Sequence, residues 1–238
     1  MLQVKEKNQT NYVNTLFSGI AEKYDLLNNL MSLGFHKKWK EKAVRLALKE
    51  STHPVEALDI CSGTGDLALL LSRLSPDTKI TSFDNCNEML TLLEKRIHEQ
   101  GIKNISLCCG DVTNLKYDNE TFDLITVGFG LRNLPLKEKC LRDVYRILKS
   151  GGVFACIDLG HPQNLIWNKI YLWCFFKLVP ILGQIFAKNK EAYSYFAHSL
   201  ASWYKQEELK DLLLKTGFKK CYFKNILGGI VAIHIAVK

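Results

Sequence analysis

The sequence has no Cys-x-x-Cys pair, although it contains eight cysteines. Zinc sites need ligands clustered at short spacings, so the sequence predicts no metal site. We expect the cysteines to be reduced and mostly buried, as in a cytoplasmic protein. The first ten residues, MLQVKEKNQT, have no apolar core, which argues against a secretory signal peptide.

A dense basic block is also absent, although 32 basic and 24 acidic residues give a net charge of +8. Tails that bind nucleic acid carry such blocks, so no nucleic-acid partner is predicted. A spread positive charge is compatible with a membrane surface or a phosphorylated substrate, and equally with simple solubility. The sequence leaves homo-oligomerisation open.

No hydrophobic run is both long and uninterrupted. Residues 164–187 (NLIWNKIYLWCFFKLVPILGQIFA) are very apolar, but two lysines, an asparagine, a proline and a glutamine break the run. A membrane span needs about 20 predominantly apolar residues. The segment instead predicts an amphipathic helix that covers a core or an apolar ligand, or that rests peripherally on a membrane surface.

Short apolar runs alternate with helical patterns through the middle of the chain, which predicts a parallel sheet covered on both faces. Expected strands are 55–60, 79–83, 105–109, 122–127 and 153–158, and expected helices are 66–74, 87–99 and 137–148. Residues 221–226 and 230–237 flank Gly228-Gly229 and predict a terminal hairpin, which makes one strand antiparallel.

The expected fold class is therefore α/β, a doubly wound, mostly parallel seven-stranded sheet with a C-terminal antiparallel hairpin. This is the topology of class I S-adenosylmethionine-dependent methyltransferases, and dinucleotide-binding folds lack the hairpin. Residues 1–50 predict a helical N-terminal cap, and residues 51–238 predict the methyltransferase domain, with a helical insertion at about 161–206.

A glycine loop follows the first predicted strand, where such sheets bind ligands. Gly63, Thr64 and Gly65 lie in the segment LDICSGTGDLA, and the glycines let the backbone approach a ligand closely. The same letters fit the G-x-G-x-x-A pattern of dinucleotide-binding proteins, so the loop alone does not discriminate between the two ligands.

Acidic residues at three successive strand ends favour S-adenosylmethionine over a dinucleotide. Asp59 suits the ammonium group of the amino-acid end, and Asp84 suits the ribose hydroxyls in either class. Asp111 is placed to meet the adenine amino group, with Val112 packing the ring. The plainer alternative is that these acids are helix caps and turn residues.

The segment after the fourth strand, VGFGLRN, usually carries the chemistry of the methyl acceptor. The sequence has neither an Asn/Asp-Pro-Pro-aromatic motif nor a Pro-Cys dipeptide, which argues against nucleobase methylation. A small or lipidic acceptor is favoured.

Further motifs resemble the menaquinone/ubiquinone biosynthesis C-methyltransferase family. They are Phe17 with AEKYD, NNLMSLG, HKKWK, GTGD, FGLRN, YRILK, Ser194-Tyr195 and Gly217-Phe218, from about residue 14 to the end. The resemblance implies a prenylated quinol methylated on a ring carbon, and contacts of Thr64, Asp84, Asp111 and Val112 with S-adenosylmethionine. The sequence departs from the residues usual in this family at Cys61-Ser62, at Gly128 and in the WYKQ segment at 203–206.

The reaction implied is conversion of demethylmenaquinol to menaquinol, with a polyprenyl benzoquinol of ubiquinone biosynthesis as the alternative acceptor. A deprotonated quinol hydroxyl makes the ortho carbon nucleophilic. Arg132 is expected to orient the phenolate and stabilise its charge, while Tyr24 and Asp66 are expected to relay the proton. The plainer alternative is that Asp66 caps a helix and that Tyr24 packs the N-terminal helices. A basic RNA methyltransferase, a non-catalytic scaffold and, more remotely, an NAD-dependent oxidoreductase remain competing hypotheses.

Overall fold

The fold is known from a computed structural model that describes residues 12–16, 18–19, 21–182, 199–200 and 202–238. Seven strands form one sheet in the order β3-β2-β1-β4-β5-β7-β6. The strands are β1 (Glu56–Ile60), β2 (Lys79–Asp84), β3 (Ile105–Cys109), β4 (Phe122–Gly128), β5 (Leu148–Leu159), β6 (Lys220–Ile226) and β7 (Val231–Val237).

The first five strands pair in parallel, and β7 runs antiparallel to both β5 and β6. The predicted fold class is thereby confirmed, including the position of the antiparallel strand. Central strands such as β4, with Leu124, Ile125 and Val127 fully buried, are apolar on both faces because helices cover both.

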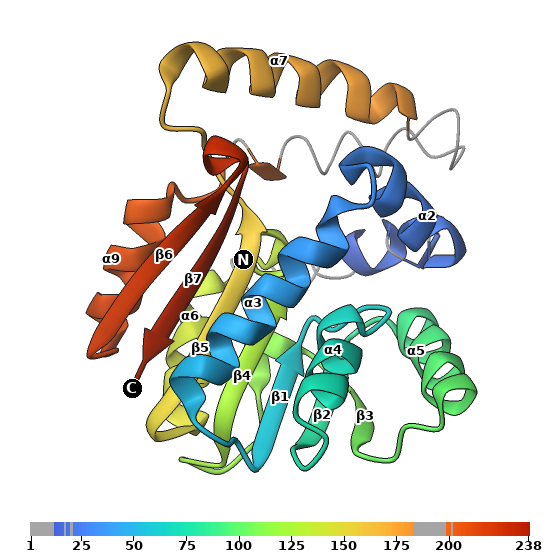
Figure 1. Ribbon diagram of the computed structural model, residues 1–238, viewed down its shortest axis with the longest axis vertical. Helices are drawn as coiled ribbons and strands as arrows, with labels where there is room; N and C mark the ends of the chain where they lie inside the picture. Colours follow the sequence, from blue (N-terminus) through green and yellow to red (C-terminus); the bar gives the residue numbers. More distant parts are fainter. Residues whose placement is uncertain (1–11, 17, 20, 183–198, 201) are drawn as a thin grey trace.

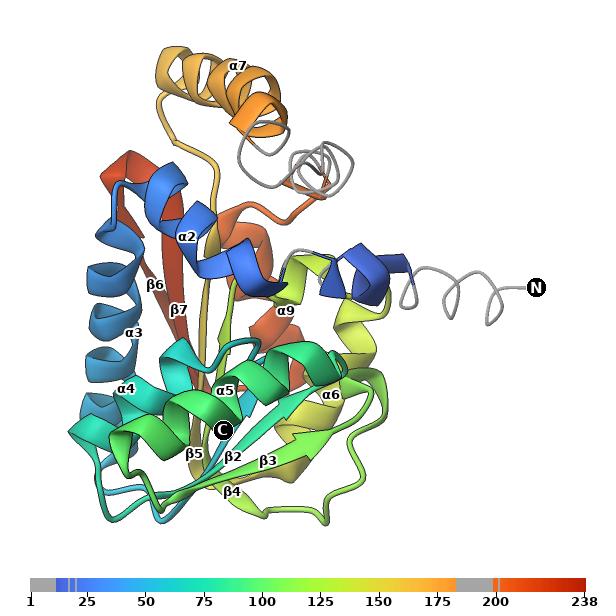
Figure 2. The same ribbon diagram turned by 90° about the vertical axis from the view of Figure 1, so that its right-hand side faces the viewer.

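Helices α3 (Phe35–Ser51) and α4 (Asp66–Leu74) cover one face of the sheet, and α6 (Lys137–Ile147) and α9 (Gln206–Thr216) cover the other (Figures 1 and 2). Helix α2 (Ala21–Ser32) lies above the carboxyl ends of the strands, and α5 (Asn87–Gln100) packs against β2 and β3. The described residues also include the short 3-10 helices η1 (Val112–Asn114), η2 (Leu131–Asn133) and η4 (Leu227–Gly229).

Helix α3 shares its core with the sheet. Ala43, Val44 and Ala47 follow helical spacing and pack among buried residues of the central strands. One and two turns nearer its N-terminus, the same buried face carries Lys40 and His36. Polar side chains on a buried helix face need partners, and theirs lie at the carboxyl edge of the sheet.

One predicted strand begins several residues earlier than expected, and one observed helix was absent from the prediction. Strand β5 begins at Leu148 because Leu148 pairs with Phe122 before the register shifts, so the strand includes the predicted turn at 149–152. Helix α9 was not predicted.

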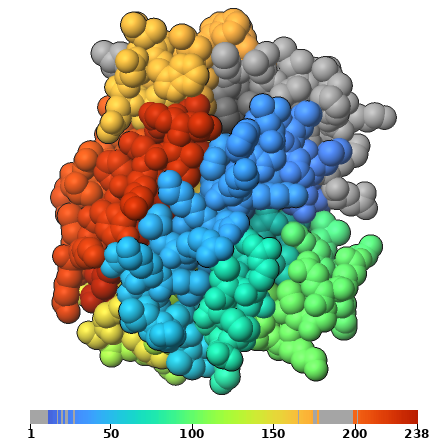
Figure 3. Space-filling view, in the orientation of Figure 1, coloured from blue at the N-terminus to red at the C-terminus, as the bar shows by residue number. Residues whose placement is uncertain are grey.

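Helix α7 (Leu165–Leu182) covers most of the helix predicted at 164–187, and residues 183–187 lie outside the described part. The helix is not amphipathic as predicted, because its apolar residues are spread around it and several are exposed. The gold surface of α7 lies next to the red surface of the C-terminal hairpin (Figure 3). In the described part of the chain, no helix has the length and apolarity that crossing a membrane requires.

Candidate functional site

The loop after β1 adopts left-handed backbone at both of its glycines. Gly63 has φ +55°, and a Cβ built there would meet open space. Gly65 has φ +82°, and a Cβ would lie 2.1 Å from the nearest Leu93 carbon, so a side chain is excluded. The first glycine therefore faces a cavity, and the second lets the loop pack on α5.

Asp84 ends β2 and holds this loop in place. One carboxylate oxygen accepts the Gly63 amide at 2.8 Å, and the other accepts the Cys86 amide at 2.9 Å. Burial raises the pKa of Asp84, while these amide hydrogen bonds act to lower it. The carboxylate keeps lone pairs for a ligand, because it offers about four acceptor positions.

Asp111 follows β3 and caps η1. Its Oδ1 accepts the Thr113 amide and the Thr113 hydroxyl, both at 2.8 Å. Val112 is buried in the main core cluster with Phe83. The capping role that the sequence left open is present, and both residues also line the cavity described next.

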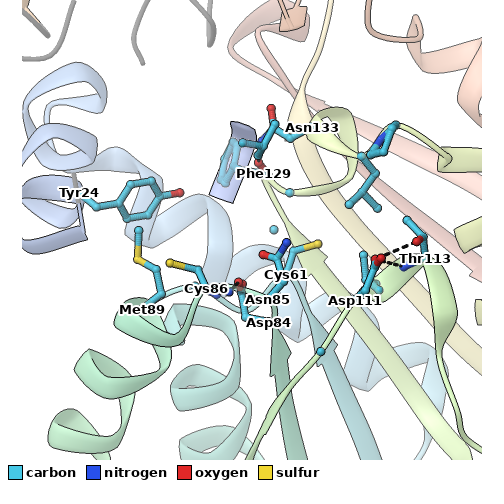
Figure 4. Close-up of a pocket in the computed structure, with 18 residues that line it drawn as sticks. Tyr24, Cys61, Asp84, Asn85, Cys86, Met89, Asp111, Thr113, Phe129 and Asn133 are labelled. Atoms are coloured by element: carbon cyan, nitrogen blue, oxygen red, sulfur yellow. Dashed lines mark hydrogen bonds between the residues drawn. The ribbon is translucent and has the colours of Figure 1, made fainter. Parts of the chain in front are cut away.

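These strand ends enclose a first cavity, which we name the polar cavity (Figure 4). Tyr24 of α2 and Met89 of α5 lie on one side of it, and Asp111 lies on the other. Its lining is Val13, Tyr24, Cys61, Gly63, Asp84, Asn85, Cys86, Met89, Gly110, Asp111, Val112, Thr113, Gly128, Phe129, Gly130, Asn133, Leu134 and Pro135.

A second cavity of about 450 Å³ adjoins the first and shares Tyr24 and Phe129 with it. We name it the apolar cavity because most of its lining side chains are hydrophobic. The lining residues come from α2, α3, η2, the end of β5, α7, η4 and the turns next to α2, β4 and η4: Tyr24, Asn28, Met31, Ser32, Leu33, Phe35, His36, Trp39, Lys40, Phe129, Arg132, Leu159, Tyr171, Leu227 and Ile230.

Arg132 of η2 lines the apolar cavity and is 7% exposed. One guanidinium nitrogen donates to Asp158 Oδ1 at 2.5 Å and to the Phe129 carbonyl at 2.6 Å. The guanidinium is thus fixed at the cavity wall by a buried carboxylate. Asp158 lies near the end of the apolar strand β5. A buried carboxylate at such a position needs a cation or a hydrogen-bond donor nearby, and Arg132 is that cation.

Asp66 lines neither cavity. It opens α4 and accepts Lys40 Nζ at 2.7 Å and Arg96 at 2.9 Å. Burial acts to raise the pKa of Asp66, but the two cations outweigh burial and lower it to about 2. At neutral pH this carboxylate is ionised, and its ion pairs with Lys40 and Arg96 fix its position.

Asp59, Thr64 and Gly65 are also outside the lining of both cavities. Asp59 is buried and accepts the Thr126 hydroxyl at 2.6 Å, and burial raises its pKa to about 7. The Thr64 hydroxyl donates to Asp25 at 2.9 Å, which joins the loop to α2. Of the ten residues named from the sequence, the polar cavity gathers Tyr24, Gly63, Asp84, Asp111 and Val112, and the apolar cavity gathers Tyr24 and Arg132.

Most of the other lining residues had no predicted role, among them the polar Cys61, Asn133, His36 and Lys40. A signal for the last two was present in the sequence. They lie seven and three residues before Ala43, on the same helical stripe as the apolar core positions, where polar side chains are unusual.

The sequence model of the ubiE/COQ5 methyltransferase family matches residues 1–238. The chain is 35% identical over 231 residues to the ubiquinone/menaquinone biosynthesis C-methyltransferase UbiE of Rickettsia akari, covering 95% of this chain and 92% of that protein. It is 32% identical over 240 residues to the demethylmenaquinone methyltransferase of Alkalihalophilus pseudofirmus, covering 100% and 99% of the two chains.

A solved structure with the same fold is a SAM-dependent methyltransferase, a possible histamine N-methyltransferase, from Thermotoga maritima. Its TM-score is 0.67 at 19% identity, with 94% of this chain and 99% of that chain covered. A putative S-adenosyl-L-methionine-dependent methyltransferase of Methanococcus maripaludis has a TM-score of 0.61 at 22% identity, covering 90% and 91% of the two chains.

Proposed function

The chain belongs to the ubiE/COQ5 methyltransferase family, and we propose that it methylates a ring carbon of a prenylated quinol with S-adenosylmethionine as donor. The acceptor we place first is demethylmenaquinol, which the reaction converts into menaquinol. One observation carries the proposal: the polar cavity at the strand ends opens beside an apolar cavity, and two aromatic side chains, Tyr24 and Phe129, line both.

The polar cavity fits S-adenosylmethionine, which supplies a methyl carbon bonded to a cationic sulfur. Asp84 has acceptor capacity left for ribose hydroxyls, and the space beside Gly63 admits a ligand close to the backbone. Asn133 Oδ1 is buried at this cavity and has no hydrogen-bond partner among the described residues. A buried oxygen without a partner suits a ligand that brings a donor.

The apolar cavity fits the quinol ring with the first part of its prenyl tail. Pockets for organic ligands are mostly apolar with a few polar groups that fix orientation. Arg132 supplies such a group, and we propose that its guanidinium orients the phenolate oxygen and stabilises the negative charge. Tyr24, at the junction of the cavities, is proposed to contact the reacting ring.

We propose a positioning role for Asp66 in place of the proton relay expected from the sequence. Its carboxylate is outside both cavities and is already engaged by Lys40 and Arg96. A carboxyl group with a pKa of about 2 is a weak proton acceptor at neutral pH.

The chemistry is tested by supplying tritiated methyl donor with reduced demethylmenaquinols and reduced polyprenyl benzoquinols. We expect tritium in the extracted naphthoquinol. The Rickettsia relatives are named for both ubiquinone and menaquinone biosynthesis, so a preference for benzoquinols would assign the alternative acceptor. No transfer to any quinol, with donor binding intact by calorimetry, would contradict the proposal.

We also propose that α7 contacts the membrane from which the substrate is drawn. Ile166, Trp167, Ile170 and Trp173 are exposed on α7, and so is Lys169. Leu33 and Leu227, at the apolar cavity, are exposed as well. Exposed aromatic and aliphatic side chains beside lysine suit an interfacial helix.

A further inference from the structure

His36 lies in the first turn of α3, is 5% exposed, and lines the apolar cavity. Among the described residues that line this cavity, it is the sole imidazole, and none is a carboxylate. The cations there, Arg132 and Lys40, have no lone pair to offer while they are charged. An apolar cavity that receives a hydroxyl to be deprotonated thus contains one group that is a base near neutral pH.

Hydrogen bonds within α2 and α3 determine which imidazole nitrogen carries the proton. Ser32 Oγ lies 2.5 Å from the Asn28 carbonyl oxygen and 2.8 Å from His36 Nδ1. A hydroxyl has one hydrogen, and a carbonyl oxygen can only accept. Ser32 therefore donates to Asn28 and accepts from His36, so Nδ1 carries the proton and Nε2 keeps its lone pair.

The Nε2 atom is 4.0 Å from Asp66 Oδ2. Lys40 and Arg96 hold that carboxylate by direct ion pairs at 2.7 and 2.9 Å. When Nε2 takes up a proton, the resulting imidazolium faces a fixed negative charge. Ser32, His36 and Asp66 thus supply the tautomer, the base and the charge that stabilises its protonated form.

We propose that His36 Nε2 is the general base that removes the quinol hydroxyl proton. The inference rests on the proposed function, because it requires a quinol ring in the apolar cavity. In the balanced step, the hydroxyl proton passes to Nε2 and leaves a phenolate. The ortho carbon then forms a bond to the donor methyl, and the carbon–sulfur electron pair stays on sulfur.

The ring carbon next loses its hydrogen as a proton to solvent, which restores the aromatic ring, and the oxygen recovers its proton from the imidazolium. One proton is released for each methyl group transferred, and His36 returns to its neutral form. Arg132 remains protonated throughout and stabilises the phenolate, so the two residues have separate roles.

The surroundings of the imidazole determine the pH range in which turnover should fall. Burial lowers the pKa of His36 below 6.5, Lys40 and Lys37 lower it further, and Asp66 and Asp25 raise it. A lowered pKa keeps the imidazole unprotonated at pH 7, which a base requires. Turnover should fall at acidic pH, with a midpoint below 6.5, as His36 becomes protonated.

The test is His36→Asn, whose side-chain amide can donate to Ser32 in place of Nδ1 but offers no counterpart of Nε2. We expect kcat to fall by about 10²–10⁴-fold, KM and donor affinity to stay within about threefold, and the acidic limb of the pH profile to disappear. The matched control is His98→Asn, an exposed histidine of α5 outside both cavities, which should behave as wild type.

Two further measurements separate a base from a structural residue. Turnover by His36→Ala should be restored in part by added imidazole, which a purely structural defect would not show. Bound 1-naphthol, measured without methyl donor so that no transfer can follow, should ionise at a lower pH on wild type than on His36→Asn, as the absorbance of the naphtholate reports.

Unchanged kcat in His36→Asn, an unchanged acidic limb, or equal naphthol ionisation on both proteins would overturn the assignment. If the wild type methylates no quinol, the proposed function fails. The naphthol measurement still decides whether His36 takes a proton from a bound hydroxyl.

Discussion

At the scale of single residues, the pKa values of two aspartates that flank one loop are shifted in opposite directions. Burial raises the pKa of Asp59 to about 7, whereas Lys40 and Arg96 overcome burial at Asp66 and lower its pKa to about 2. The sequence pattern could not distinguish them, because both are acids beside a glycine loop. Partners that come from α3 and α5 decide the difference.

Asp59 gives a prediction for stability against pH. Its folded-state pKa is raised from 3.8 to about 7, so between these values the folded state binds more protons than the unfolded state. The stabilisation is fully present below about pH 4 and is lost as the pH rises through 7. Asp59→Asn has no carboxylate to ionise, so its free energy of unfolding should not fall in this way. At pH 8 it should exceed that of wild type by up to about 4 kcal/mol, since each pKa unit is worth about 1.36 kcal/mol.

Urea unfolding of both proteins at pH 5 and pH 8 measures the difference in the free energy of unfolding. Asp77→Asn, an exposed carboxyl group in the turn before β2, is the control and should track wild type. Equal pH dependence of Asp59→Asn and wild type would show that Asp59 is ionised in the folded state.

Asp84 gives a prediction for the donor. Asp84→Ala removes the acceptor that we propose for the ribose hydroxyls, and two charge-assisted hydrogen bonds are worth about 1.5–3 kcal/mol each. We expect S-adenosylmethionine affinity to fall by at least about a hundredfold, measured by calorimetry. Asp77→Ala again serves as the control, and unchanged affinity of Asp84→Ala would place the ribose elsewhere.

Arg132 must be tested together with its buried partner. Arg132→Ala leaves Asp158 buried without its cation, which costs about 3–5 kcal/mol in stability, so a loss of turnover alone would be ambiguous. The pair Arg132→Met with Asp158→Asn removes both charges and should recover most of the unfolding free energy. We expect kcat of the pair to stay low while donor affinity remains within a few-fold. Wild-type turnover by the pair would exclude a role for the guanidinium at the acceptor ring.

At the scale of elements, local signals predicted most of the fold. Residues 66–74 and 105–109 form α4 and β3 with the predicted bounds. Helix α9 was missed although its signals are local: Glu208 accepts the Lys205 amide at 2.8 Å at the start, and Gly217 ends the helix. The start of β5 could not be predicted, because pairing of Leu148 with Phe122 fixes it from another strand.

Helix α7 gives a prediction for membrane contact. Its exposed Ile166 and Trp173 are 72% and 63% accessible, and Lys169 and Lys177 are exposed on the same helix. Vesicles with anionic lipid should bind the protein, and Ile166→Ser with Trp173→Ser should weaken binding by at least about tenfold in a sedimentation assay. Leu214→Ser changes an exposed leucine of α9 instead and should bind as wild type. Equal binding of all three proteins would exclude α7 as the contact.

At the scale of the whole molecule, the site is assembled from distant segments. Residues that line the apolar cavity extend along the chain from Tyr24 to Ile230. The sequence predicted which strand ends would meet, because parallel strands bring their carboxyl ends to one edge. It could not predict that Tyr24 and Phe129 would join two cavities, or that His36 would lie opposite Asp66, since tertiary packing of α2 and α3 fixes both.

The joined cavities give a prediction for the redox state of the substrate. A quinone ring is electron-poor and has no hydroxyl, so it offers neither a proton for His36 nor a phenolate for Arg132 to stabilise. Two-electron reduction supplies both, and loss of the proton makes the ortho carbon nucleophilic toward the methyl of a sulfonium. The enzyme should therefore methylate the quinol under anaerobic, reducing conditions and be nearly inactive on the same compound kept oxidised.

Methyl transfer from tritiated donor is measured on both redox forms, with absorbance spectra recorded throughout to establish that the quinone stays oxidised. The control is donor affinity, which calorimetry should find equal under both conditions, because the polar cavity does not depend on the acceptor's redox state. Equal rates on the two forms would overturn the roles given to both Arg132 and His36, since each acts on a hydroxyl that the quinone lacks. A rate confined to the quinol would require a separate reductase reaction to supply the substrate before this enzyme acts.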